Sequence, residues 1–234
     1  MRLVFVRHGE PDYEHDSLTE KGWRESQLLV PRLRGEDSID TIYCSPLGRA
    51  LDTAKATLAA TKMEPVICPW LKEFFVPVID PQTGEQRIPW DFLPGWWTEQ
   101  PEFYHKDTWL QSPVMRSGNV AAEYQKVCDG IDSLLAEYGY ERQGNFYRSN
   151  DPKEESLIFF CHLGAEFAVL SHLLGIAPPL LWQGFFVAPS SLTILETEER
   201  KPGEAFFRCK TLGDTSHLYI AGEKPSEMGF FGQA

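Results

Sequence analysis

The stretch SLIFFCH, residues 156–162, contains the clearest buried strand in this chain. A continuous apolar run between polar segments is typical of a strand that is covered on both faces, as in a parallel sheet. His162 ends the run, and the pattern beyond it predicts a helix from about Ala165 to Leu174, closed by Gly175. A strand that leads directly into a helix is the repeating unit of α/β folds.

The same alternation extends in both directions along the chain. Apolar runs predict further strands at residues 3–6, 41–45, 64–68, 190–199 and 204–213, the last two forming a hairpin. Amphipathic periodicity predicts helices at residues 20–33, 46–60 and 119–138. This order of elements predicts an α/β fold, a three-layer sandwich with a mostly parallel central sheet.

Turn and capping residues refine these boundaries. Thr19 is the expected N-cap of the first long helix, and Pro31 is expected to kink that helix or stop it early. Pro46 is expected in the first turn of the second helix. Residues 141–155 are polar and irregular, so we interpret them as a loop.

Composition limits the class of protein. The chain has 234 residues, which fits one α/β domain spanning residues 1–234. Its net charge of −12 disfavours nucleic acid as a partner. No apolar run is long enough for a membrane span, and no leader pattern is visible, so we expect a soluble, cytoplasmic protein. The sequence is compatible with a homodimer.

The cysteines give a similar indication. The chain contains five of them, an odd number, without a CxxC pair. This pattern argues against both a disulfide framework and a structural zinc site. We therefore expect buried free thiols in a reducing compartment.

Polar groups follow the predicted strands at their carboxyl ends. His8 follows the first strand, Ser45 the second, and His162 the buried one, and in a parallel sheet these ends share one rim. Arg7 beside His8 offers a fork of donors for phosphate or carboxylate. Arg49 lies one turn into a helix whose N-terminus already favours anions.

Three motifs occur together in this order: a strand followed by RHG at residues 7–9, SPxxRAxxTA at residues 45–54, and a histidine at the end of a later strand. With these motifs the sequence resembles the histidine phosphatase superfamily, also called phosphoglycerate-mutase-like, over most of its length. The resemblance implies that His8 is a nucleophile that becomes phosphohistidine. It implies that Arg7 and Arg49 clamp the phosphoryl oxygens and that His162 donates to the same group.

The resemblance also implies phosphate contacts from Gly9 and Leu163, which follow the two histidines. The general acid of the family lies in an L-x-E element, which Glu73 matches in WLKEF. Asp91 and Glu85 are alternatives for that proton role.

One position departs from the family pattern. Many relatives place a phosphate-binding asparagine six residues after the nucleophile, and this chain has Glu14 there. Either Glu14 turns away from the phosphate, or Tyr13 or His15 covers the gap. Near the other end of the chain, a polar stretch at residues 215–217 either borders the cleft or forms a simple turn.

Residues 70–118 fit the family pattern worst. They hold five of the seven tryptophans, many prolines and little periodicity. We interpret them as an insertion that forms either a lid over the active site or a satellite core. As a lid, this segment would contact a bulky leaving group through Trp90, Trp96 and Trp97, with Arg87 meeting a second anionic group.

The function expected from these residues is hydrolysis of a small-molecule phosphomonoester through a phosphohistidine. Two arginines and a histidine donor can neutralise the phosphoryl oxygens, so no metal or other cofactor is expected. A phosphoglycerate-type mutase is the nearest alternative, because it uses the same catalytic groups. A non-catalytic phosphate-binding or scaffold module is the alternative from another class.

Overall fold

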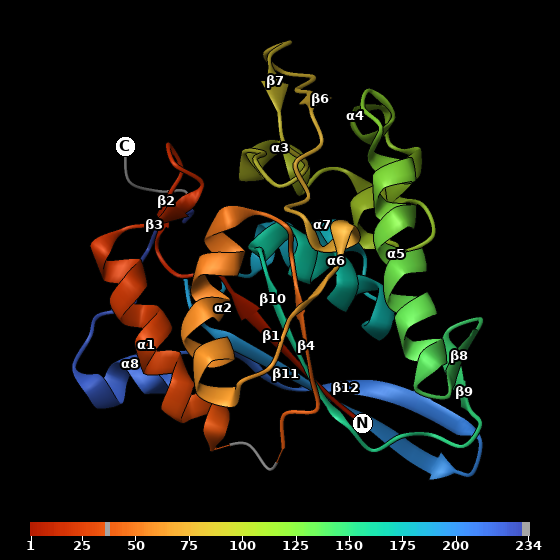
Figure 1. Ribbon diagram of the computed structural model, residues 1–234. Helices are drawn as coiled ribbons and strands as arrows, with labels where there is room; N and C mark the ends of the chain where they lie inside the picture. Colours follow the sequence, from red (N-terminus) through yellow and green to blue (C-terminus); the bar gives the residue numbers. More distant parts are fainter. Residues whose placement is uncertain (36–37, 231–234) are drawn as a thin grey trace.

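A computed structural model of the chain describes residues 1–35 and 38–230. Within these residues, eight strands form one sheet in the order β5-β4-β10-β1-β11-β12-β9-β8 (Figure 1). The strands are β1 (Arg2–Arg7), β4 (Thr41–Cys44), β5 (Val66–Ile67), β8 (Tyr140–Gln143), β9 (Phe146–Ser149), β10 (Ser156–Cys161), β11 (Leu192–Lys201) and β12 (Glu204–Asp214). The α/β prediction is confirmed.

The sheet is more mixed than the sequence predicts. Strands β5, β4, β10 and β1 run parallel, whereas β11, β12, β9 and β8 continue the sheet with antiparallel pairings. The β11–β12 hairpin is the one expected around residues 202–203. The parallel half therefore has the strand-end rim on which the site prediction depends.

Helices cover both faces of the sheet, which gives the three layers. The helices α1 (Glu20–Arg34) and α2 (Gly48–Thr61) lie on one face, and α5 (Val120–Glu137) and α6 (Leu163–Leu174) lie on the other (Figure 1). Alternation along β1 separates the two cores: Val4 packs with the α1 and α2 side, and Phe5 packs with the α5 and α6 side. Both faces of the strand are buried, as its continuous apolar sequence predicts.

Helix boundaries follow the capping residues in part. The Thr19 side chain accepts a hydrogen bond from the Gly22 amide and caps α1 as predicted. Pro31 does not end α1, which continues to Arg34, because the buried side chain of Leu33 holds the last turn against the core. Pro46 lies before Leu47, the N-cap of α2, and not in the first helical turn.

The interpretation of residues 141–155 as a loop is wrong at its start. Strands β8 and β9 form a hairpin there, with Gly144 in a left-handed conformation (φ 62°) at the turn. Tyr147 on β9 packs edge-on against Phe207 of β12, with ring centroids 5.3 Å apart. Packing against a distant strand, which local polarity does not reveal, fixes this segment as sheet.

The tryptophan-rich segment forms a chain of short elements. Between residues 70 and 118 the structure has the end of η1 (Pro69–Leu71), then β6 (Val78–Ile79), β7 (Gln86–Arg87), α3 (Pro94–Trp97), η2 (Pro101–Tyr104), η3 (Trp109–Gln111) and α4 (Pro113–Arg116). Several of its side chains, among them Phe74, Phe103 and Trp109, belong to the same core as α5 and α6. Part of the segment therefore closes the core.

Three smaller elements complete the fold. They are a two-stranded ribbon of β2 (Pro11–Asp12) and β3 (Ser17–Leu18), the helix α7 (Pro178–Gly184) against α6, and the helix α8 (Ser216–Ala221) against α1. Four cysteines are buried as free thiols, but Cys209 is exposed on β12, so that expectation fails at one position. Among the described helices, none is both long and apolar enough to cross a bilayer.

Candidate active site

The two histidines meet because their strands are neighbours. Strand β1 pairs in parallel with β10, Arg7 opposite Cys161, and the His8 amide donates to the Cys161 carbonyl at 3.0 Å. The rings of His8 and His162 therefore lie with centroids 5.2 Å apart, at an interplanar angle of 54°. The shared rim predicted for the carboxyl ends of the strands is confirmed.

The geometry of His8 leaves one ring nitrogen available. Its Nδ1 lies 2.8 Å from the carbonyl oxygen of Gly9, which can only accept, so Nδ1 carries the proton and Nε2 carries the lone pair. Burial, followed by the charges of Arg7 and Arg49, holds the pKa of His8 well below its usual value. The ring is therefore neutral near neutral pH, as an attacking imidazole must be.

Two guanidinium groups flank the imidazoles. Arg7 donates through Nη1 to the Val187 carbonyl at 2.6 Å and through Nη2 to the Met228 carbonyl at 2.9 Å. Arg49 is held by Asp16, at 2.5 Å from its Nη1. Both arginines act on His8 electrostatically, which places their charges close to its ring.

Three buried donors point to an anionic ligand. Within the described part of the chain, Arg7 Nε, Arg49 Nε and His162 Nδ1 have no hydrogen-bond partner. Leaving a buried polar group unpaired costs about 1–3 kcal/mol, so a ligand that accepts from these three atoms together would be stabilised. Two guanidinium groups and an imidazole match the oxygens of a phosphoryl group.

Ser45 is the hydrogen-bond partner of His162 Nε2. The Ser45 hydroxyl lies 2.8 Å from His162 Nε2, and its oxygen also accepts from the Leu47 amide at 3.3 Å. Donation of the hydroxyl proton to Nε2 leaves the ring proton on Nδ1, which is the tautomer that can donate to a phosphoryl oxygen. Burial, followed by the neighbouring His8, Arg49 and Arg7, holds the pKa of His162 well below its usual value, so this ring is also neutral.

Glu73 reaches the rim from the loop after η1. Its Oε1 accepts from the amides of Phe74 at 2.8 Å and Ala165 at 3.2 Å, the latter in the first turn of α6. A Cβ at Gly164 would lie 2.7 Å from that oxygen, so glycine is needed for this approach. Burial raises the pKa of Glu73, and its backbone hydrogen bonds and the two arginines lower it in part.

A model of the histidine phosphatase superfamily (branch 1) matches residues 3–209. The chain belongs to this superfamily. Among curated proteins, none matches the sequence.

Solved structures share the fold of this histidine phosphatase, each with a TM-score of 0.58. A phosphoserine phosphatase from Entamoeba histolytica is 19% identical and matches over 93% of this chain and 98% of its own. An alpha-ribazole phosphatase from Shigella flexneri is 24% identical, over 92% and 96%. A mycobacterial glucosyl-3-phosphoglycerate phosphatase is 17% identical, over 92% and 99%. At these identities the likeness establishes the fold.

The other two candidates for the proton role in this histidine phosphatase are engaged with an arginine. Asp91 and Glu85 both pair with Arg87, at 3.1 and 3.6 Å, in the segment around β7. Arg87 also contacts Asp80 at 2.8 Å, so its charge is held by three carboxylates. The sequence predicts that Arg87 meets a second anionic group of the substrate. In the structure these three carboxylates already balance its charge.

The backbone of Gly9 is also occupied. Its amide, for which the sequence predicts a phosphate contact, donates to the Thr53 hydroxyl at 2.9 Å. Glycine is needed for a different reason, since a Cβ there would lie 2.9 Å from the carbonyl oxygen of Gly22 in α1. Leu163 begins α6 directly after His162, and its side chain is buried.

At the position that departs from the family pattern, Glu14 faces solvent and its neighbour Tyr13 contacts the arginines. Glu14 is exposed, and His15 pairs with Asp12 at 2.8 Å. The ring of Tyr13 lies under the guanidinium of Arg49, with 5.6 Å between its centroid and Cζ, and its hydroxyl interacts with Arg7. Tyr13 therefore contacts both arginines.

Sequence reasoning missed a buried carboxyl behind the site. Glu166 lies on α6 and is fully buried. Burial raises its pKa to about 7, and Arg7 acts on it to lower the pKa. On a helix a glutamate ordinarily faces solvent, so the sequence carries no signal of this position.

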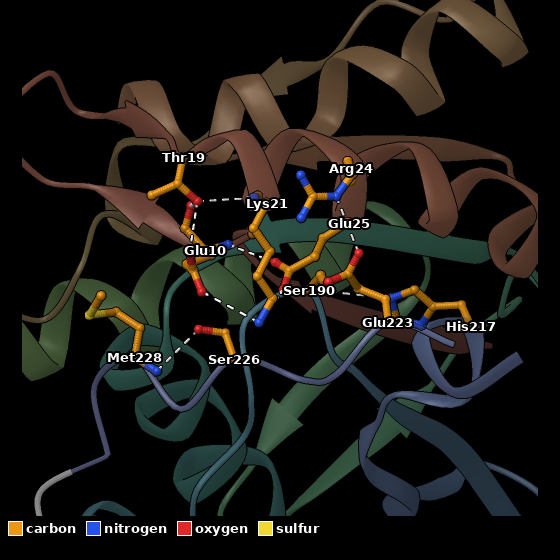
Figure 2. Close-up of polar contacts among 12 residues, drawn as sticks. Glu10, Thr19, Lys21, Arg24, Glu25, Ser190, His217, Glu223, Ser226 and Met228 are labelled. Carbon is orange, nitrogen blue, oxygen red and sulfur yellow. Dashed lines mark hydrogen bonds and ion pairs between the residues drawn. The ribbon is translucent and has the colours of Figure 1, made fainter. Parts of the chain in front are cut away.

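The C-terminal segment lies against the loop that follows β1. Figure 2 shows Glu10 between Thr19 and Lys21, with Ser226 beside it and bonded to the Met228 amide. Ser226 also acts on the Glu10 carboxylate and lowers its pKa. This attachment places the Met228 carbonyl on Arg7.

The polar stretch at residues 215–217 reaches the site indirectly, through Ser190. His217 on α8 lies 3.3 Å from the Ser190 hydroxyl, and the Ser190 amide donates to the carbonyls of Arg7 and His8. Figure 2 includes the Ser190 and His217 side chains. His217 therefore supports the backbone of the RHG turn and does not contact the rim itself.

Proposed function

We propose that this protein is a metal-independent phosphatase that hydrolyses a small-molecule phosphomonoester through a phosphohistidine. The observation that carries the proposal is the neutral His8, with Nε2 available, next to His162 and between two arginines. Membership of the superfamily supports it, as do the phosphatase names of the similar structures. Buried thiols at four positions fit a cytoplasmic protein.

In the first step, His8 Nε2 attacks phosphorus and a P–N bond forms as the P–O bond to the alcohol breaks. Arg7, Arg49 and His162 Nδ1 donate to the phosphoryl oxygens, so the charge that develops on them is stabilised without a metal. Glu73 in its protonated form gives its proton to the leaving oxygen. Its raised pKa favours that form more than in a solvated carboxyl.

In the second step, water attacks the phosphohistidine and the P–N bond breaks. Glu73, now a carboxylate, takes a proton from the attacking water, which regenerates both the acid and the free imidazole. Inorganic phosphate leaves. A mutase would return the phosphoryl group to a second substrate at this step, so the fate of the phosphoryl group separates the two activities.

The test is phosphate release from a panel of phosphomonoesters in the presence of a chelator and without a bisphosphate primer. We expect release by the wild type and a loss of at least about 10³-fold for His8→Ala. Rapid quenching with ³²P-labelled substrate should trap acid-labile, base-stable label on the wild type alone. No release without a primer would favour the mutase, and no turnover or label on any ester would favour a non-catalytic module.

A further inference from the structure

A cavity of about 530 Å³ lies beside the phosphoryl site, and its walls come from three separate parts of the chain. These parts are the segment that includes α3, the region from the start of α6 to the residues just after α7, and the C-terminal segment. The lining residues with the largest apolar surfaces are Trp90, Phe92, Trp97, Trp182, Phe185, Phe186 and Phe230.

The walls of the cavity are also walls of the catalytic rim. Leu163 lines the cavity and directly follows His162. Trp90 packs so closely on Gly164 that a Cβ there would lie 2.5 Å from its ring, and the same Cβ would lie 2.7 Å from Glu73 Oε1. On the opposite side, Phe186 lies under the guanidinium of Arg7, with 5.4 Å from its ring centroid to Cζ.

The cavity is rich in rings and poor in positive charge. None of the described residues that line it is a lysine, arginine or histidine, and the sequence beyond residue 230 contains none either. Its charged lining residue is Asp91, and Gln183 adds an amide. Arg87 is paired with Asp91, Asp80 and Glu85, so its charge is already balanced.

We propose that this cavity receives the alcohol part of the substrate and that this part is an aromatic ring system without a negative charge. Stacking on Trp97 and Phe185 would stabilise the ring, and hydrogen-bond donors on its edge would meet Asp91. A carboxylate on the alcohol would be desolvated beside Asp91 without a cation to pair with it. The inference rests on the proposed function, because it concerns the leaving group of that reaction.

The test compares three esters that share a primary alkyl alcohol as leaving group: 2-naphthylmethyl phosphate, its 6-carboxy analogue and ethyl phosphate. We expect kcat/KM for the naphthylmethyl ester to exceed that for ethyl phosphate by about 100-fold, because ring burial is realised only with the first. The carboxylate should lower kcat/KM by at least about 10-fold. Equal values for the three esters would overturn the inference and leave the phosphatase activity standing.

Variants locate the effect in the cavity. Trp97→Ala and Phe185→Ala, both at partly exposed rings, should lower the naphthylmethyl-to-ethyl ratio about 10-fold. Trp97→Arg should raise the relative rate of the carboxylated ester. Trp23→Ala, on α1 and 37% exposed, is the matched control and should keep the wild-type ratio. The same loss in this control would contradict the assignment.

A binding measurement keeps the inference testable without turnover. In calorimetry, 2-naphthylmethylphosphonate should bind the wild type at least about 10-fold more tightly than ethylphosphonate, and Trp97→Ala should remove most of that difference. Equal binding of the two phosphonates would overturn the cavity assignment. Naphthyl-selective binding with no hydrolysis of any ester would instead overturn the phosphatase proposal.

Discussion

The imidazole rings of His8 and His162 lie with centroids 5.2 Å apart, and within the described residues each keeps one nitrogen without a hydrogen-bond partner. In His8 this nitrogen is Nε2, because Nδ1 contacts the Gly9 carbonyl. In His162 it is Nδ1, because Nε2 contacts Ser45. His8 therefore offers a lone pair for attack on phosphorus, and the Nδ1–H tautomer of His162 offers a donor to the phosphoryl oxygens.

Ser45→Ala should test whether the Ser45 hydroxyl favours the Nδ1–H tautomer of His162. Without the hydroxyl, the Nδ1–H form loses its preference, and we expect kcat to fall about 10-fold for any ester. Steady-state kinetics with Ser45→Thr, which keeps the hydroxyl, provide the comparison. If Ser45→Ala and the wild type have the same kcat, the hydroxyl has no part in orienting the proton.

Glu73→Gln should depend strongly on the leaving group. An alkyl alcohol needs a proton as it departs, so its kcat should fall by about 10²–10⁴-fold. For 4-nitrophenyl phosphate, whose leaving group is acidic, the rate of phosphohistidine formation in single-turnover experiments should fall much less. Equal losses for both esters would remove Glu73 from the acid role and direct attention to Asp91.

The pH profile should reflect the two shifted groups. Since the pKa of His8 is lowered, its neutral form persists to well below pH 6.5, and protonation of this ring limits the rate only in acid. Since the pKa of Glu73 is raised above 4.5, its acid form is lost as pH rises through that higher value. For an alkyl ester, kcat/KM should therefore decline toward high pH, by up to about tenfold per unit.

The control for this profile is 4-nitrophenyl phosphate, for which the decline should be shallower. The ionisation of substrate phosphate is common to both esters. The difference between the two pH curves therefore reports the ionisation of the general acid, Glu73. An alkyl-ester rate that keeps rising to about pH 8 would contradict a protonated Glu73 in the first step.

Asp16→Ala should loosen Arg49. Asp16 bonds both Arg49 Nη1 and the Gly48 amide, and its backbone has a left-handed φ of 46°. Alanine removes both contacts and tolerates this φ less well, so KM should rise about 10-fold with some loss of stability. Asp16→Asn keeps one acceptor and tolerates the conformation. Its midpoint of thermal unfolding and its KM should therefore lie between those of the wild type and those of Asp16→Ala. A KM unchanged in both variants would show that Arg49 needs no such support.

Glu25→Gln should change how stability depends on pH. Glu25 is fully buried on α1, its Oε2 accepts from the Glu10 amide at 2.7 Å, and burial raises its pKa to about 7. Between the unfolded value of 4.5 and about 7, the folded state holds the proton more tightly, so the free energy of unfolding falls as pH rises. The loss is at most about 3 kcal/mol and is complete above that range.

A neutral glutamine should remove this part of the pH dependence. Denaturant unfolding of Glu25→Gln and wild type at several pH values between about 4 and 8 measures it. We expect the variant to gain stability relative to wild type as pH rises. Parallel curves for the two proteins would show that Glu25 does not titrate in this range.

Local sequence predicted the elements that carry their own pattern. The apolar run of β10, the N-cap at Thr19 and the closing Gly175 of α6 all have reasons within a few residues, and each is found as expected. The β8–β9 hairpin and the exposure of Cys209 depend on which distant strand each segment faces. No periodicity in the sequence encodes the distant partner strand. The predictions of a loop at the β8–β9 hairpin and of a buried thiol at Cys209 were therefore wrong.

The sequence by itself determined which groups stand at the ends of the strands, Arg7, His8 and His162, because a buried strand followed by a turn places its next residues at the rim. Only the tertiary structure decided the protonation and direction of those groups. Ser45 acts on His162 across 117 residues and the Met228 carbonyl on Arg7 across 221. Burial and through-space partners set a pKa and a tautomer, and both come from packing between segments that are remote in the chain.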